Sequence, residues 1–388
     1  HGYEGSGRGF AIRFRSVLDA ETPHWRNTSL TAPIRWSASD PLEPLTRRMF
    51  LLDAQAPPVS DDEVNIAVER WNPGTAEDNE LEEAFGLLVD AHYRTSPGDL
   101  RQWMDDPAAV SWRLTRGGVL VGVLWATVEG GLDSELAEQV MLGKRRLRGH
   151  LLPQSLATHS GFAEAACQRL LRIVRVAVSA EVRGEGVGQT LVAAANDYAC
   201  KQGLDGIGTS FGGNAGLLSF WQRCGLESVR LGLKREASSG EYPLQLLAGV
   251  SAQGKALTDH LRRRLTEHWL TLVPRNWMDA EPELILRITC SLPAGRPLNK
   301  DDFRDLHSFA NGHRGFDLAL PVLRRLSLQA GVVNGMTDER SRSLWARAVL
   351  QGWSWPDLQA DGECVGREAG EAELRSLVGD ILQNRPDL

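Results

Sequence analysis

The sequence predicts an α/β fold, a mixed central sheet flanked by helices, followed by a mostly helical C-terminal domain. Three observations support this prediction. A nearly continuous apolar run over residues 171–178, rich in β-branched side chains, is typical of a strand buried on both faces. A glycine-rich turn leads from this strand into a helix expected over about 187–202. From Ser251 onward the strand patterns end and apolar residues recur at helical spacing.

Length, composition and charge exclude several classes of protein. At 388 residues the chain is long enough for two or three domains. It contains no run of about 18 apolar residues and no secretory signal, so we expect a cytoplasmic protein without a membrane partner. Five scattered cysteines without C-x-x-C spacing predict reduced thiols and no metal site. A net charge of −7 means that any RNA binding must depend on local basic patches.

The other elements are read from periodicity and turn signals. The pair Gly117-Gly118 supplies the positive φ that a two-residue turn needs, and it predicts a hairpin over 112–128. Expected helices cover residues 81–93, 98–104, 214–223, 301–310, 317–329 and 341–351, with one ending near 140 and one along 257–272. Expected strands cover residues 10–14, 204–211, 226–233 and 242–250.

The glycine-rich turn after the central strand is the strongest functional signal. A turn that opens a helix offers unpaired backbone N–H groups and the positive end of the helix dipole, which together hold a pyrophosphate. The dinucleotide pattern G-x-G-x-x-G fails, because Gln189 or Leu191 stands where the third glycine is required. A P-loop would need a lysine, and the turn has none. The pattern that remains is R-x-x-G-x-G, formed by Arg183, Gly186 and Gly188. The plain alternative is a tight turn without a ligand.

The pattern R-x-x-G-x-G resembles the acetyl-CoA signature of the GNAT N-acetyltransferases. A second stretch, FWQRCGL at 220–226, resembles the second signature of those proteins, an aromatic helix that ends in glycine before the next strand. The resemblance implies the GNAT N-acetyltransferase fold, with the glycine-rich turn after the fourth strand.

Further stretches are similar to one GNAT family, the bacterial tRNA(Met) cytidine acetyltransferases. That family uses acetyl-CoA and ATP to form N4-acetylcytidine at the wobble base of elongator tRNA(Met). The similar stretches are GYEGSGRGF at 2–10, AHYRTSPGDLR at 91–101, EGGL at 129–132, RLRGHLLPQSLA at 146–157, RIVRVAVSAEVRGEGVGQ at 172–189, SFWQRCGL at 219–226 and REASSG at 235–240. The C-terminal part matches only loosely, through FxxLHSFANGHRG at 303–315.

The resemblance also implies how the chain is divided. We expect the tail of a helicase-like (RecA-like) ATPase module at 1–52, a linker at 53–78, the GNAT domain at 79–250 and a helical tRNA-binding domain at 251–388. Because the phosphate-binding loop G-x-x-x-x-G-K-S/T is absent, we expect a fragment of a longer chain that lacks most of its N-terminal ATPase module. Arg8 would contact ATP, and ATP with Mg would bind completely only in the full-length protein.

For acetyl-CoA, the resemblance assigns residues on the central strand, the turn and the second signature. The backbone of Val176, Ala177 and Val178 would pair with the pantetheine arm. Arg223 would meet the charged end of the cofactor. The residues that would wrap the pyrophosphate are Arg183, Gly184, Glu185, Gly186, Val187, Gly188 and Gln189.

The reaction would also need a base and a surface for RNA. The exocyclic amine of cytosine is a poor nucleophile that must lose a proton, so positioning and a general base would carry catalysis. His92 is the first candidate, although it could instead cap or pack a helix; Tyr93 is weaker and Glu129 weaker still. The basic run at residues 144–150 would hold the anticodon phosphates. The alternative is that it is only a solvated loop. The expected RNA contacts are Lys144, Arg145, Arg146, Arg148, Arg263 and Arg314.

Two other functions stay open at this point. A GNAT acetyltransferase acting on a protein or a small-molecule amine would not need the basic run or the helical tail. A non-catalytic RNA-binding protein could keep the fold, but its glycine turn would be expected to degenerate, and Gly186 and Gly188 are intact. Binding of tRNA separates the first function from the second, and binding of acetyl-CoA separates the third from both.

Overall fold

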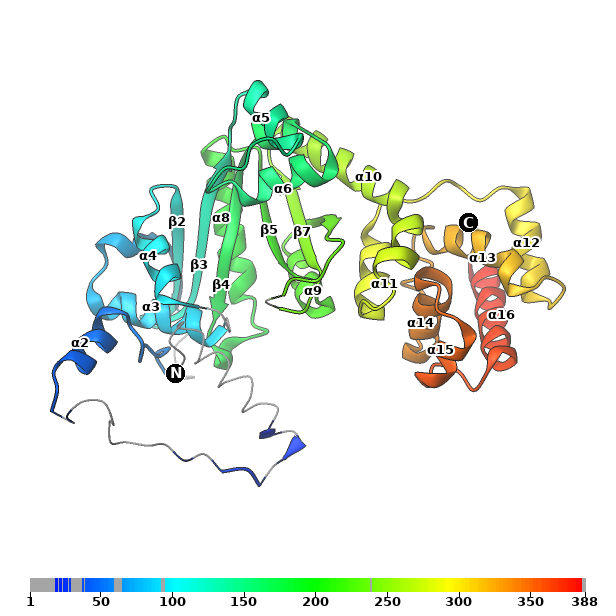
Figure 1. Ribbon diagram of the computed structural model, residues 1–388, viewed down its shortest axis with the longest axis horizontal. Coiled ribbons are helices and arrows are strands. Elements are labelled where there is room, and N and C mark those ends of the chain that lie inside the picture. Colours follow the sequence, from blue (N-terminus) through cyan, green and yellow to red (C-terminus); the bar gives the residue numbers. More distant parts are fainter. Residues whose placement is uncertain are drawn as a thin grey trace. The chain divides into compact units, whose positions relative to one another are not determined.

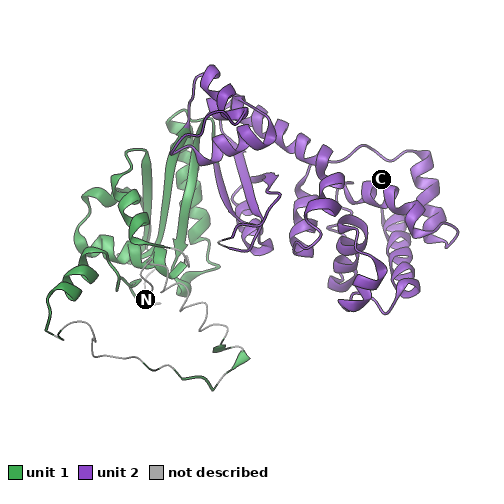
Figure 2. Cartoon of the chain, in the orientation of Figure 1, with its two compact units in different colours: residues 1–129, 169–207 green, residues 130–168, 208–388 purple. Residues whose placement is uncertain are grey.

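The computed structural model (Figure 1) describes residues 18–19, 21–22, 24–26, 28, 37, 39–58, 65–91, 95–237 and 239–385. The chain forms two compact units, coloured separately in Figure 2. Unit 1 comprises residues 1–129 and 169–207, and unit 2 comprises residues 130–168 and 208–388. The strand expected at 10–14 lies outside the described residues.

Unit 1 contains four neighbouring strands. Their order is β1 (Ile66–Trp71), β2 (Ala109–Arg116), β3 (Val119–Gly130) and β4 (Arg169–Val178). The predicted hairpin is confirmed as β2 and β3, with Gly117 at φ 58° and Gly118 at φ 83°. Strand β1 pairs antiparallel with β2. It falls inside residues 53–78, which we expected to be a linker, so residues 66–71 belong to the sheet.

Helices of unit 1 cover both faces of these strands. The helices are α2 (Leu42–Met49), α3 (Asp78–Ala91), α4 (Pro97–Asp105) and α8 (Val187–Lys201). Trp103 of α4 lies against Trp125 of β3, with ring centroids 6.0 Å apart. Its Nε1 donates to Ser111 Oγ on β2 at 2.7 Å. The next residue along β2, Trp112, points to the opposite face and meets Tyr198 of α8 edge-on at 5.5 Å. Helices α4 and α8 therefore lie on opposite faces of the strands.

Unit 2 begins with helices α5 (Ser134–Met141), α6 (Leu151–Ser160) and α7 (Glu164–Cys167). Its strands run in the order β5 (Gly206–Gly212), β7 (Pro243–Gly249) and β6 (Glu227–Leu231), and helix α9 (Ala215–Arg223) connects β5 to β6. Helix α6 packs closely on β5, since a Cβ at Gly208 would lie 2.6 Å from Leu152 Cδ2. Strands β6 and β7 are antiparallel and carry an irregularity between Ser228 and Arg230.

The rest of unit 2 is helical, as the sequence predicts. The helices are α10 (Ala252–Asn276), α11 (Pro282–Ser291), α12 (Lys300–Ala310), α13 (Phe316–Ser327), α14 (Glu339–Trp345), the π-helical segment η3 (Ala346–Gln351), α15 (Trp355–Ala360) and α16 (Arg367–Asn384). Three fully buried tryptophans, Trp269, Trp277 and Trp345, form much of its core. None of the helices in the described ranges is long and apolar enough to cross a membrane.

Candidate functional site

The glycine-rich turn connects β4 to α8 in unit 1, where the sequence predicts it. After β4 the chain makes a short 3-10 turn, Ala180–Val182, and α8 begins at Val187. Gly184 and Gly186 have φ values of 88° and 87°. Residues that carry a side chain rarely adopt this left-handed backbone conformation, so the turn needs glycine to have this shape. A Cβ at Gly184 would meet nothing within 4 Å, which shows that the outer surface of the turn is open.

The first turn of α8 presents backbone N–H groups to that open surface. Gly186 is the N-cap, and among the described residues no side chain caps the helix. The first bond into the helix runs from Thr190 N to Gly186 O at 2.9 Å. The N–H groups of Val187, Gly188 and Gln189 precede it and so lack an acceptor within the helix. With the positive end of the helix dipole, these N–H groups are suited to hold an anion.

Two charged side chains of the turn are held by the protein. Arg183 Nε donates to Val178 O at 3.3 Å, which folds the guanidinium back toward the end of β4. Glu185 Oε2 accepts from Arg116 Nη1 of β2 at 2.9 Å. The carboxylate of Glu185 is therefore neutralised by an arginine, and the anion-binding character of the turn comes chiefly from its backbone.

Helix α8 is fixed against the sheet through a glycine in β3. A Cβ at Gly122 would lie 2.9 Å from Val187 Cγ1 and 3.0 Å from Leu191 Cδ1. The first turn of the helix can approach the strand so closely only because this position has no side chain. The close approach sets where the N–H groups at the start of α8 stand.

Of the three candidate general bases, the structure describes only Glu129. His92 and Tyr93 lie outside the described residues, as does Arg8 in the expected ATPase tail, so their roles stay predictions. Glu129 is buried in β3 and bound to Arg172 Nε of β4 at 2.6 Å. A buried carboxylate held in an ion pair stabilises its partner's charge, so the geometry favours a structural role for Glu129 over a catalytic one.

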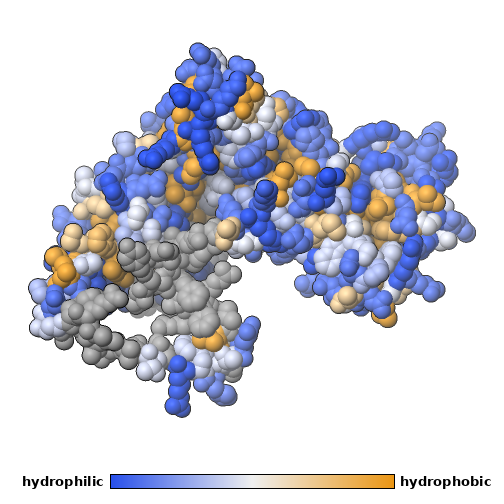
Figure 3. Space-filling model, in the orientation of Figure 1, coloured by the Kyte–Doolittle hydropathy of each residue, from blue (hydrophilic) through white to orange (hydrophobic). Residues whose placement is uncertain are grey.

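The basic run lies in unit 2, in the loop between α5 and α6. Lys144, Arg145, Arg146 and Arg148 are all exposed, and within the described ranges they form no ion pair. The loop itself is held by its backbone, because Lys144 N donates to Gln139 O at 2.9 Å and Leu147 N donates to Gln154 Oε1 at 2.7 Å. Figure 3 shows strongly hydrophilic residues over the region of α5. The loop thus presents cations to solvent from a fixed backbone.

The remaining predicted contacts also lie in unit 2. Arg223 is the last residue of α9 and is exposed. Arg263 is exposed on α10. Arg314 precedes α13 and forms an ion pair with Asp305 at 3.3 Å, so its charge is partly engaged. Their roles toward acetyl-CoA and RNA stay predictions.

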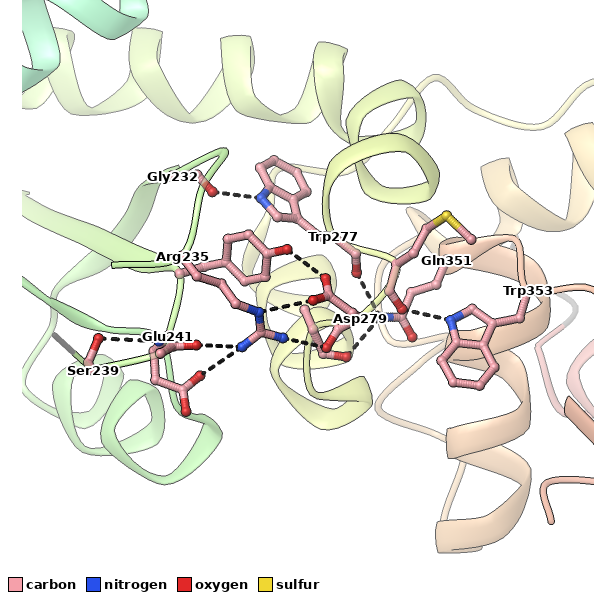
Figure 4. A network of polar contacts seen from close by, with 12 residues as sticks. Gly232, Arg235, Ser239, Glu241, Trp277, Asp279, Gln351 and Trp353 are labelled. Atoms are coloured by element: carbon pink, nitrogen blue, oxygen red, sulfur yellow. Dashed lines mark hydrogen bonds and ion pairs between the residues drawn. The ribbon is translucent and has the colours of Figure 1, made fainter. Parts of the chain in front are cut away.

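A polar network that the sequence did not reveal fixes the loop between β6 and β7 (Figure 4). Arg235 donates from Nε to Asp279 Oδ2 at 3.0 Å and from Nη1 to Gly240 O at 2.6 Å. Tyr242 donates to Asp279 Oδ1 at 2.6 Å. Trp277 Nε1 donates to Gly232 O at 2.7 Å. The network joins this loop to the segment between α10 and α11, and it gives Arg235 of the REASSG stretch a structural role.

Two family models match the chain. Residues 1–53 match "RNA cytidine acetyltransferase NAT10/TcmA, helicase domain", and residues 83–203 match "GNAT acetyltransferase 2". Residues 83–203 form a GNAT acetyltransferase domain. The predicted fold class and the helicase-related segment at the N-terminus are thereby confirmed.

Curated relatives confirm the predicted resemblance. Proteins named "tRNA(Met) cytidine acetyltransferase TmcA" include one from Nitrosococcus halophilus, 38% identical over 97% of this chain and 53% of that protein. Another, from Vibrio cholerae, is 34% identical over 99% of this chain and 53% of that protein. The chain spans about half the length of the curated relatives it matches. A solved structure of Arabidopsis thaliana NAA60 in complex with acetyl-CoA overlaps 48% of this chain and 99% of that one, with 16% identity and a TM-score of 0.34.

Proposed function

We propose that this chain belongs to an enzyme that transfers acetyl from acetyl-CoA to N4 of the wobble cytidine of elongator tRNA(Met), with ATP required by the full-length protein. The observation that carries the proposal is the turn before α8, where glycines in the left-handed region present open N–H groups inside a GNAT domain. The names of the curated relatives support the tRNA substrate. Such an enzyme works in the cytoplasm, where tRNA is found.

The turn fits the pyrophosphate of acetyl-CoA. The N–H groups of Val187, Gly188 and Gln189 would donate to its oxygens, and the dipole of α8 would favour its charge. The ion pair with Arg116 neutralises the carboxylate of Glu185, which reduces its repulsion of the pyrophosphate. The backbone of residues 176–178 in β4 would lie along the pantetheine arm, with Arg223 at the charged end. Acetyl-CoA would supply the activated acetyl group.

The protein's own task in the chemistry is to place the cytosine amine and remove its proton. The amine lone pair is delocalised into the ring, so a positioned base contributes about 10²–10⁴-fold to such a reaction. We assign that base to His92, with Tyr93 as the alternative. Glu129 is set aside because its carboxylate is committed to Arg172.

The basic loop would hold the RNA. A wobble base lies in a single-stranded loop, so it can be splayed into a pocket at small unstacking cost. Lys144, Arg145, Arg146 and Arg148 are exposed and would bind the anticodon phosphates. Arg263 and Arg314 would extend this contact on the helical part. ATP and Mg would bind to the ATPase module, with Arg8 as one contact.

Nucleoside mass spectrometry tests the proposal. Elongator tRNA(Met) is incubated with acetyl-CoA and this chain, and in parallel with the full-length protein and ATP. N4-acetylcytidine in either reaction, absent when Gly186→Glu is used, supports the proposal. A product only with the full-length protein assigns an RNA-remodelling task to the ATPase module. No product in either reaction, with acetyl-CoA still bound, contradicts the tRNA substrate and favours a protein or small-molecule amine. If the chain binds the tRNA but not acetyl-CoA, the result favours a non-catalytic RNA-binding protein.

A further inference from the structure

Helix α2 carries an apolar face that the described part of the chain leaves uncovered. Leu42, Leu45 and Met49 stand three and four residues apart, so they lie on one side of the helix. Their exposed fractions are 65%, 54% and 63%, and no residue of α2 is buried. Phe50 and Leu52, which follow the helix, are exposed as well, and Figure 3 shows hydrophobic residues over this region. These five residues form the α2 patch, and a cluster of large exposed apolar side chains marks an interaction surface.

The α2 patch belongs to the segment that is related to a helicase domain. Residues 1–53, which match the helicase-domain model, contain all five of its residues. This chain spans about half the length of the curated relatives, so those proteins contain much more chain than is present here. A helix that belongs to a larger module exposes, when alone, the apolar face with which it packs in that module. The rest of the helicase-related module is therefore the partner that fits the patch.

The turn after α2 is fixed in a conformation that leucine rarely adopts. Among the described residues other than glycine, only Leu51 has a positive φ, 49°. It ends the helix as glycine usually does, with the N–H of Leu52 donating to the carbonyl of Arg47 at 3.0 Å. A leucine in this conformation costs energy, which is offset because its side chain packs against the core cluster around Trp103. The turn therefore fixes the direction of α2 relative to the residues that follow it.

The residues after this turn, 53–56, form an anchor on α3 in a stretch that the sequence predicts to be a linker. Ala54 is fully buried, in the core cluster that α3 forms with the sheet. A Cβ at Gly86 of α3 would lie 2.3 Å from the carbonyl carbon of Gln55, so the two backbones are in contact. Such a close approach is possible only at a glycine. The carboxylate of Asp53 is bound to an arginine of α2 at 3.1 Å, which joins the anchor to that helix.

Helix α3 also supports the segment that carries the candidate general bases. The helix ends at Ala91, and His92 and Tyr93 follow it directly in the chain. Beyond that segment, the buried Thr95 donates from Oγ1 to the carbonyl of Leu88, in the last turn of α3, at 2.9 Å. Both ends of the segment are therefore fixed to the half of α3 that the anchor contacts.

We propose that the α2 patch docks onto the rest of the helicase-related module of the full-length protein, and that the anchor holds this module in a fixed place on the GNAT domain. A flexible linker would let the module swing freely, whereas the turn at Leu51 and the contact at Gly86 prevent this. The segment after α3 would then lie at a set position relative to the module. The inference rests on the proposed function only where the module is taken to act on the acetylation reaction.

The first test compares the hydrogen exchange of α2 in this chain and in the full-length protein. In this chain the amides of residues 42–50 should exchange fast, because the helix buries none of its side chains. In the full-length protein they should exchange at least about tenfold more slowly, because docking covers the patch. The control is α4, which packs on the sheet and should exchange equally in both proteins. Equal exchange of α2 in both proteins would overturn the docking.

A substitution in the patch identifies its partner. Met49→Glu should leave the Tm of this chain unchanged, because the side chain is exposed. In the full-length protein it should abolish the slow exchange of α2, because an unpaired carboxylate is costly to bury. The matched control, Met49→Leu, keeps an apolar side chain of similar volume and should keep the slow exchange. If sedimentation shows that this chain forms a dimer and that Met49→Glu dissociates it, the patch binds a second copy and the proposal is wrong.

The second test asks whether the attachment must be rigid. Insertion of Gly-Ser-Gly-Ser after Phe50 lengthens the link between α2 and the anchor by about 11 Å. In the full-length protein, N4-acetylcytidine formation should fall at least about tenfold while ATP hydrolysis persists, because the module loses its set position. The same insertion after Gly362, in an exposed turn of unit 2, is the control and should change neither activity. Unchanged N4-acetylcytidine formation after the first insertion would overturn the fixed placement.

Failure of the proposed function is seen separately, in nucleoside mass spectrometry of the wild-type full-length protein. A protein in which α2 exchanges slowly but no N4-acetylcytidine forms keeps the docking and loses the proposed reaction. A protein that forms N4-acetylcytidine while α2 exchanges as fast as in this chain keeps the reaction and loses the docking.

Discussion

Two regions of this molecule are suited to hold phosphates, and each would do so by different physics. In unit 1 the turn before α8 presents backbone N–H groups, and its own carboxylate is neutralised by Arg116. In unit 2 the loop before α6 presents four exposed cationic side chains. The supports are alike, because each helix starts on a strand glycine, Gly122 beneath α8 and Gly208 beneath α6.

The difference lies in where the specificity resides. A backbone site depends on φ values and on the position of a helix, so one wrong residue removes it altogether. In a side-chain site several similar charges each contribute to the affinity. Each substitution therefore removes only part of the affinity, and salt weakens all the contributions. We therefore expect large, all-or-none effects at the turn and graded effects at the loop.

The largest effect is expected from Gly186→Glu. The backbone of residue 186 would have to keep φ 87° with a side chain attached, and the new carboxylate would stand where we propose that N–H groups face the pyrophosphate. Acetyl-CoA affinity should fall by at least about 100-fold, the equivalent of losing charged hydrogen bonds of about 3 kcal/mol. Isothermal titration calorimetry measures this. Gly203→Glu is the matched control, because Gly203 has φ 61° at the opposite end of α8 and nothing within 4 Å of a Cβ. If both variants lose acetyl-CoA affinity equally, the loss comes from backbone strain and not from the position of the new carboxylate.

Replacing Lys144, Arg145, Arg146 and Arg148 together by Gln should come next. Exposed charge pairs contribute about 0.5 kcal/mol each, so losing four should lower the affinity for the anticodon stem-loop of elongator tRNA(Met) about 30-fold while acetyl-CoA affinity stays the same. The salt slope should fall by up to about 3. The control replaces four exposed cations elsewhere, Arg48, Arg101, Lys201 and Arg367. If the control weakens RNA binding as much, net charge rather than the loop holds the RNA.

The glycines beneath the two helices, Gly208 and Gly122, should differ in how well they tolerate replacement by alanine. A Cβ at Gly208 would lie 2.7 Å from the backbone oxygen of Leu246, which cannot yield easily. Gly208→Ala should therefore lower the free energy of unfolding by about 1–3 kcal/mol. Gly122→Ala should cost less, because its contacts are the ends of the Val187 and Leu191 side chains. Urea denaturation compares the two. A larger loss for Gly122→Ala would contradict this difference between the supports.

The smallest effect is expected from Arg116→Gln. The pair with Glu185 is partly exposed, so its loss should change unfolding free energy by less than about 1 kcal/mol. Acetyl-CoA affinity should fall a few-fold, because the freed carboxylate stands in the turn. The double variant Arg116→Gln with Glu185→Gln should restore the affinity. A lasting loss in the double variant would mean that Arg116 itself binds the ligand.

Much of the fold could be predicted because it follows from local chemistry. The hairpin and the turn before α8 depend on glycines whose positive φ is a property of the residue itself. The helical C-terminal part follows from apolar periodicity, although α11, α15 and α16 were not among the expected helices. Strand β1 was missed because it is a largely exposed edge strand, without the apolar alternation that marks a buried one.

Other features depend on relations between distant segments. The facing of Arg230 and Gln245 depends on the register of β6 and β7, which shifts near Ser228 and cannot be read along the chain. The commitment of Glu129 to Arg172 likewise requires two strands to be paired. Helix α6 has Pro153 in its first turn, where proline is tolerated although it breaks a helix elsewhere, so this stretch was not predicted as a helix.

The most direct test of two separate phosphate sites measures both ligands on the same proteins. Acetyl-CoA binding by calorimetry and stem-loop binding by anisotropy are compared for the wild type, Gly186→Glu and the variant with four substitutions at residues 144–148. We expect Gly186→Glu to lose acetyl-CoA and keep the stem-loop, and the loop variant to do the reverse. Loss of both ligands in either variant, or of neither, would contradict this account of the molecule.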